Sequence, residues 1–100
     1  MASRIRTKSP VASKHYTLYV TGVDAFHGTE IELRGSAVFY RYTDGSAILC
    51  GRIKTPYGLK SCKCDYDCEM RAFGEDIPAD GSDRDIIFSW REAFRRMREA

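Results

Sequence analysis

The cysteines are the residues of this chain whose types and spacing offer the most chemistry. They are Cys50, Cys62, Cys64 and Cys68, and three of them lie in the segment SCKCDYDCEM at 61–70. Side chains alternate along a strand, so Cys62 and Cys64 would share one face of an extended segment. A hairpin turn at 55–58 would bring Cys50 across from them. Four thiolates gathered in this way are typical of a structural zinc site, and zinc is therefore a candidate cofactor.

Other interpretations of the cysteines stay open. The spacing C-x-C-x₃-C differs from the C-x₂-C pairs of most zinc sites, and the acidic residues between the cysteines would oppose a cluster of thiolates. Reduced cysteines that pack as small hydrophobic residues are the favoured alternative. A disulfide from Cys50 to Cys62 or Cys64 is less favoured, because a cytoplasmic location is expected and thiols stay reduced there. A catalytic thiol is least favoured, because no C-x-x-C pair or neighbouring His would activate it.

No other motif predicts catalysis. His15 and His27 each flank an expected strand, and the sequence places no nucleophile beside either. The segment DGSDRD at 80–85 lacks the residue order of a calcium loop. The chain also has no nucleotide-binding glycine loop and no serine elbow. We therefore expect a protein that is not an enzyme.

Size, composition and charge narrow the class of protein. One hundred residues, 43% hydrophobic and 30% charged, are typical of one folded domain with a modest core. No secretory signal pattern and no apolar run of ~18 residues is present, so we expect a cytoplasmic protein without membrane contact. The net charge of +2 is mild, but 65–85 carries eight acidic residues against two basic ones. Charge separated into zones favours docking of a charged partner.

Four strands are expected to position these residues. Alternation of apolar and polar residues predicts them at 15–23, 29–42, 47–53 and 59–68. Gly35, isolated inside the second strand, predicts a bulge or a bend. An Asp-Gly pair at 44–45 predicts a tight hairpin that pairs Tyr42 with Ala47. This register places on one face Val38, Tyr40, Tyr42, Leu49 and Ile53, and on the other Ala37, Phe39, Ile48 and Cys50.

One amphipathic helix is predicted at 83–100, with Ser82 as its N-cap. At 100° per residue its core face carries Ile86, Ile87, Trp90, Ala93, Phe94 and Met97. The fold class is therefore α+β, a four-stranded antiparallel meander sheet packed by one C-terminal amphipathic helix. This single domain spans 14–100, and residues 1–13 form a flexible basic N-terminal arm. The helix covers one face of the sheet, so the arm, a second subunit or a partner is expected on the other.

A small protein-interaction module is the favoured function. It would be an inhibitor or adaptor that sterically occludes a protein partner or a nucleic-acid-binding complex. The expected partner-binding residues are Arg84, Phe88, Arg91, Arg95 and Arg98 on one helix flank, with Glu75, Asp76 and Asp80 in an acidic loop. Arginine and aromatic residues dominate binding hot spots, and the acidic loop would mimic phosphates. Phage-encoded inhibitors of host defence, anti-CRISPR proteins included, are one candidate class.

A nucleic-acid-binding module is the alternative. An aromatic sheet face would stack unpaired bases while basic residues neutralise phosphates. The aromatic candidates are Tyr16, Tyr19, Phe39, Tyr40 and Tyr42, and the basic ones are Arg41, Arg52, Lys54, Lys60 and Lys63. The basic arm and the arginine-rich helix flank would add to this surface. A steep fall of affinity with salt would distinguish this function from a protein contact.

Overall fold

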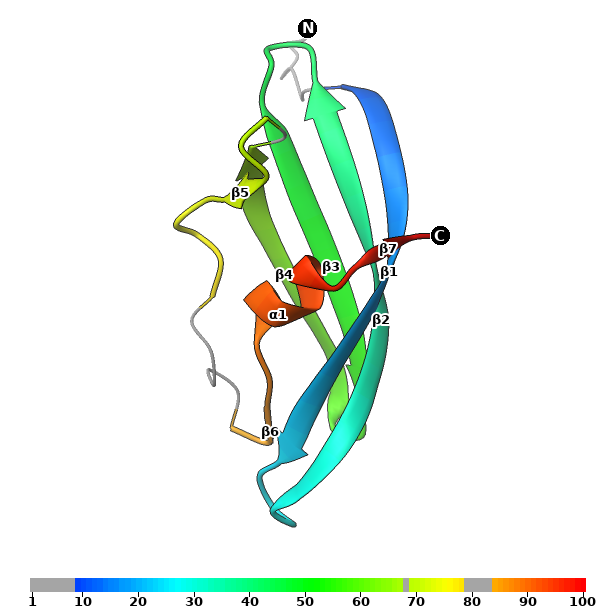
Figure 1. The fold of residues 1–100 in the computed structure, drawn as a ribbon, viewed down its shortest axis with the longest axis vertical. Coiled ribbons are helices and arrows are strands. Elements are labelled where there is room, and N and C mark those ends of the chain that lie inside the picture. Colours follow the sequence, from blue (N-terminus) through cyan, green and yellow to red (C-terminus); the bar gives the residue numbers. More distant parts are fainter. Residues whose placement is uncertain (1–8, 68, 79–83) are drawn as a thin grey trace, which may run out of the picture.

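One long antiparallel sheet dominates the molecule, which the computed structural model describes over residues 9–67, 69–78 and 84–100. The elements are β1 (Pro10–Asp24), β2 (Thr29–Tyr42), β3 (Ala47–Thr55), β4 (Gly58–Asp67), β5 (Ala72–Phe73), β6 (Ile86–Ile87), α1 (Trp90–Arg95) and β7 (Arg98–Glu99). The strand order is β5-β4-β3-β2-β1-β6, and β7 also pairs with β1. Figure 1 shows the long strands curling into a half-barrel with α1 on its concave side.

The expected α+β fold class is wrong, chiefly in its helix. The predicted helix at 83–100 is reduced to the six residues of α1. On either side the chain is extended, because β6 pairs with the end of β1 and β7 with its middle. These edge contacts satisfy backbone groups that a helix would otherwise pair, and the β-branched residues of β6 favour a strand. The molecule is therefore a curled, mostly β structure and not a four-stranded meander packed by an amphipathic helix.

A serine N-cap sets the start of α1. Ser89 is the N-cap, and its hydroxyl accepts a hydrogen bond of 3.1 Å from the backbone N–H of Glu92. The expected cap, Ser82, lies outside the described residues. Because the chain before Ser89 is extended, its side chains alternate. Ile86 and Phe88 therefore point into the core, whereas Ile87 is 43% exposed.

The turn between β2 and β3 reverses the expected faces of the sheet. It closes on Tyr42 and Ser46 and has three residues, 43–45, whereas the expected pair of Tyr42 with Ala47 leaves four. Gly45 has φ +89°, and the N–H of Tyr42 donates to the carbonyl of Ser46. Arg41 consequently pairs with Ala47, one residue away from the expected register. A slip of one residue moves every side chain of one strand to the opposite face. Phe39 thus shares the concave face with the buried residues of β3, and the prediction that paired Tyr42 with Ala47 is wrong.

Gly35 marks a close backbone approach and not a bulge. The β2–β3 ladder runs without interruption through the pair Gly35 and Ile53. A Cβ atom at Gly35 would lie 1.8 Å from the carbonyl oxygen of Arg52. Only glycine leaves the room that this tightly coiled part of the sheet requires.

The core lies between the concave face and α1. Its most deeply buried large side chains are Leu18, Leu49, Ile53, Cys64, Ile86 and Phe94. The helix rests on Gly51, where a Cβ atom would come within 2.7 Å of the ring of Phe94. Neighbouring rings extend this contact, since Phe94 packs 5.6 Å from Trp90 and 5.5 Å from Phe73. These contacts fix α1 across the opening of the half-barrel.

The first strand begins earlier than expected. Residues 10–13, which were assigned to the flexible arm, belong to β1, and Pro10 and Ser13 pair with Tyr42 and Tyr40 of β2. The preceding part of the expected arm, residues 1–8, lies outside the described residues. No helix in the described part of the chain has the length and the hydrophobicity that crossing a membrane requires.

Candidate functional site

The strands separate the cysteines instead of gathering them. Cys62 and Cys64 are buried on the concave face, whereas Cys50 pairs with Lys63 and is half-buried on the convex face. Because adjacent strands share the direction of their pleat, Cys50 points away from the other two. The described residues contain no group of three His, Cys, Asp or Glu side chains that could hold a metal ion. The zinc prediction is therefore contradicted for these three residues, and Cys68 lies outside the described part.

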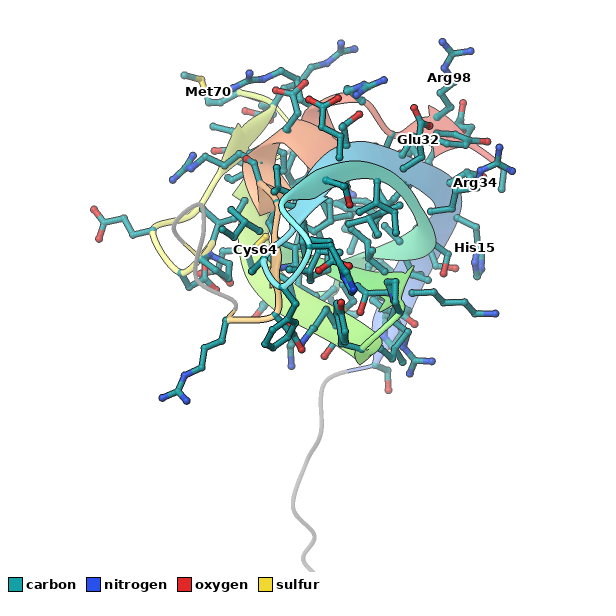
Figure 2. The ribbon with its side chains drawn as sticks, turned by 90° about the horizontal axis from the view of Figure 1, so that it is seen from below. His15, Glu32, Arg34, Cys64, Met70 and Arg98 are labelled. Carbon is teal, nitrogen blue, oxygen red and sulfur yellow. The ribbon has the colours of Figure 1, made fainter. Side chains whose placement is uncertain are left out.

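Cys62 and Cys64 act as core residues. Both are free thiols, and Cys64 is fully buried, as Figure 2 shows inside the curve of the sheet. The hydrogen bond between the two thiols is the main cause that raises the pKa of Cys64, and burial is the next. The same hydrogen bond lowers the pKa of Cys62. Their main contribution is to fill space under α1.

A basic groove on the concave side is the described surface with the most binding chemistry. Its volume is about 750 Å³. Five basic residues line it: Lys14, Arg41, Arg71, Arg91 and Arg95. Five aromatic residues form its floor: Tyr16, Phe39, Tyr66, Phe73 and Phe94. We call these residues, with Ala72 and Met97, the basic groove; none of them is acidic.

Regular secondary structure positions most of the groove. Lys14 and Phe39 are register partners on β1 and β2, on the face that also carries Arg41. Arg91 and Arg95 lie four residues apart on α1, which places their side chains on one side of the helix. Side chains from elements far apart in the sequence therefore converge on one surface.

The aromatic rings of the floor contact one another in series. Tyr66 lies 5.7 Å from Phe39 and 5.4 Å from Phe73, between ring centroids. Tyr16, Tyr66 and Phe73 are half-buried and so present part of their rings to the groove. The guanidinium of Arg41 lies 5.8 Å from the centre of the Phe39 ring. This arrangement offers flat apolar surface beside fixed positive charge.

The positive charge of the groove is only weakly balanced. Lys14 contacts Glu99 at 3.5 Å and Arg95 contacts Glu92 at 3.5 Å, and the four side chains are 44–71% exposed. Exposed pairs of this kind contribute little. Among the described residues, no carboxylate lies within ion-pair distance of Arg41, Arg71 or Arg91. An anionic ligand would therefore meet cations that are free to pair.

Of the expected partner-binding residues, the structure brings Arg91 and Arg95 together in the basic groove, and Arg95 also lines a neighbouring hollow with Arg98. Arg84 is exposed before β6, and Arg98 lies on β7. Phe88 is only 6% exposed, since its segment is extended and turns it into the core, so its side chain is not a surface contact. Lys14 and Arg71 were missed as groove residues, because no local pattern joins them to α1.

The expected acidic surface is divided. Both carboxylate oxygens of Asp76 accept hydrogen bonds from the backbone N–H of Asp65, at 3.0 and 3.1 Å, so this residue holds the edge of β4. Glu75 is exposed, and Asp80 lies outside the described residues. A second hollow, beyond Tyr66, is lined by acidic residues of 65–69. This acidic hollow and the basic groove adjoin, because Arg41, Tyr66, Ala72 and Phe73 line both.

Asp24 forms a polar cluster at the other end of the half-barrel. One carboxylate oxygen accepts from the backbone N–H groups of Phe26 and His27, at 3.0 and 3.2 Å. The other accepts from the hydroxyl of Tyr57 at 2.7 Å and contacts Nδ1 of His27 at 3.0 Å. The hydrogen bond with Tyr57 is the main cause that lowers the pKa of Asp24 to about 2 and raises that of Tyr57 to about 12. The cluster ties the β1–β2 turn to the β3–β4 turn.

Comparison with known proteins assigns this chain to no family. No protein-family model, curated protein or solved structure matches this chain.

Proposed function

We propose that the protein is a non-enzymatic, cytoplasmic binding protein whose basic groove takes single-stranded nucleic acid. One observation carries the proposal: five cations and no acidic residue line a groove whose floor is aromatic. Phosphates of a nucleic-acid strand would pair with the cations and release counterions. Unpaired bases would stack on the half-buried rings, a contact worth about 1–3 kcal/mol per base.

The test is the salt dependence of binding to a labelled 20-nucleotide oligothymidine, followed by fluorescence anisotropy. For a single strand, each neutralised phosphate contributes about 0.7 to the slope of log K against log salt. Arg91→Glu should therefore reduce the slope by about 0.7, and Arg91→Glu with Arg95→Glu by about 1.4. Arg84→Glu is the matched control, because this exposed arginine adjoins β6, away from the groove. Unchanged affinity and slope in the double variant would overturn the proposal.

A second candidate is the inhibitor or adaptor that occludes a protein partner, with anti-CRISPR inhibitors as one class. It is favoured by exposed apolar side chains near the Asp24 cluster: Phe26 is 69%, Leu59 57% and Ile87 43% exposed. Large exposed apolar patches are typical of protein interfaces. If the oligothymidine does not bind, Phe26→Ser and Leu59→Ser should be assayed for loss of a copurifying protein or of a homodimer.

A further inference from the structure

We propose that the basic groove continues as a track around the edge of β1 and onto the convex face, where it binds the same nucleic-acid strand. The inference rests on the proposed function and extends it, because it assigns a second surface to the site. Its evidence comes from side chains that the groove does not include. They are Arg34, Arg52, Lys54 and Lys63 on the convex face, and Arg96 and Arg98 at the β1 edge.

Four cations adjoin one another on the convex face, which also carries the carboxylates of Glu30, Glu32 and Asp65. Arg34 on β2 lies directly opposite Lys54 on β3, and Arg52 follows two residues away on the same face. Like charges placed opposite each other destabilise a sheet. All four convex cations are exposed, and no carboxylate of the described residues lies within ion-pair distance of them. A sheet that carries this repulsion is suited to an anionic partner that relieves it.

A hollow at the β1 edge joins the two faces. It measures about 560 Å³ and shares Arg95 and Met97 with the basic groove. Its remaining lining is Tyr19, Glu32, Arg96 and Arg98. Three arginines thus outweigh the one acidic residue. Figure 2 shows Arg98, Glu32 and Arg34 on the same side of the molecule.

Tyr19 connects this hollow with the convex face, because it lines the hollow and contacts Arg34. The guanidinium of Arg34 lies 5.8 Å from the centre of the Tyr19 ring. Arg34 is in turn the register partner of Lys54. Neighbouring strands lie about 4.8 Å apart, so three spacings from β1 to β4 extend the track by about 14 Å beyond the edge. Beyond the hollow at the β1 edge, the register thus places Arg34 on β2, Lys54 and Arg52 on β3, and Lys63 on β4.

The shape of the path selects a single strand. The molecule measures 52 × 32 × 24 Å, and the proposed track passes from the groove on its concave side, through the hollow at the β1 edge, to its convex side. A DNA duplex has a persistence length of about 150 base pairs and resists bending on this scale. A single strand turns freely and exposes its bases to Tyr19 as well as to the groove.

The test compares oligothymidines of four and twenty nucleotides on two sets of variants. Arg52→Glu with Lys54→Glu alters only the convex face, and Arg91→Glu alters only the groove. We expect the convex variant to bind the four-nucleotide probe as the wild type does. For the twenty-nucleotide probe its salt slope should fall by about 1.4, so that the loss of affinity between 50 and 200 mM salt becomes about sevenfold smaller. Arg91→Glu should weaken binding of both probes.

The melting temperature shows whether the convex variant, Arg52→Glu with Lys54→Glu, is folded. Lys54→Glu places an acid opposite Arg34, which turns a repulsive cross-strand pair into an attractive one, so its melting temperature should be at least that of the wild type. If the convex variant binds the long probe with unchanged slope while Arg91→Glu is impaired, the track is refuted and the groove stands. If neither variant changes binding, both proposals fail. Preference for a twenty-base-pair duplex over the single strand, lost in the convex variant, would also refute the path around the edge.

Discussion

A methyl group added at Gly51 tests how α1 is held on the sheet. In Gly51→Ala the new Cβ would lie 2.7 and 2.9 Å from two carbons of the Phe94 ring and 3.0 Å from the Trp90 ring. Carbon atoms attract optimally at about 3.5–4.0 Å, so both rings would have to retreat by roughly 0.5–1 Å. Because the rings belong to α1, the whole helix would have to lift from the sheet.

The size of the effect follows from two opposing terms. Overpacking a tight core costs about 1–3 kcal/mol, whereas replacing a glycine inside a strand by alanine gains about 0.5–1 kcal/mol. The difference spans about 0–2.5 kcal/mol. Because three ring carbons would lie at 2.7–3.0 Å from the methyl group, we expect a net destabilisation of about 1–2 kcal/mol. For a domain of this size, 1 kcal/mol lowers the melting temperature by about 4–8 °C, so a fall of about 4–16 °C is expected. Ser61→Ala, on the exposed side of the neighbouring strand, is the control and should change little.

A double-mutant cycle identifies the contact that causes the loss. Urea unfolding is measured for Gly51→Ala, for Phe94→Leu and for the two together. Leucine lacks the ring atoms that approach Gly51, so the methyl group should cost little in the Phe94→Leu background, giving a coupling of about 1–2 kcal/mol. If Gly51→Ala melts at or above the wild type, or costs as much beside Leu as beside Phe, α1 does not rest on Gly51 and our account of the groove is wrong.

Two further predictions concern the ionisable groups. The pKa of Asp24 falls from its usual 3.8 to about 2 on folding, so its carboxylate stabilises the fold above pH 4, and this contribution is lost as the pH falls from 4 to 2. The difference in unfolding free energy between the wild type and Asp24→Asn should therefore narrow over that range in urea titrations; a constant difference would contradict a role of the charge. In a Cys68→Ser background, a thiol reagent should modify Cys50 in the folded protein but Cys62 and Cys64 only after denaturation. Equal reaction of all three would mean that α1 does not cover the concave face.

The positions of the long strands could be predicted from local pattern. The segments expected at 15–23, 29–42, 47–53 and 59–68 coincide with β1 to β4 to within a few residues. Alternating side chains and turn residues carry this information within a few neighbours of each residue. The acidic and basic zones could also be predicted from the sequence. Local pattern therefore predicts those structural features that depend on residues close together in the chain.

The candidate site could be predicted only in part, because it joins distant elements. Arg91 and Arg95 were identified from their helical spacing, and Phe39 and Arg41 as members of a sheet face. Their convergence depends on the curl of the sheet, which brings β1, β2 and β5 beside α1. No spacing along the chain encodes that curl.

The sequence by itself determined which segments are strands, where the turns lie and how charge is distributed. Only the tertiary structure decided the register at Gly45, where a turn one residue shorter than expected exchanged the faces of β2 relative to β3. The β3–β4 register, decided in the same way, pairs Cys50 with Lys63 and so separates it from Cys62. The tertiary structure also decided the length of α1, since Ile86 and Arg98 found partners on the open edge of β1. The physical reasons differ. The register depends on which two residues close the turn, and a change of one residue there moves every side chain to the other face. The edge pairing is set by hydrogen bonds between residues far apart in the chain, and these outweigh the local helix preference of 83–100.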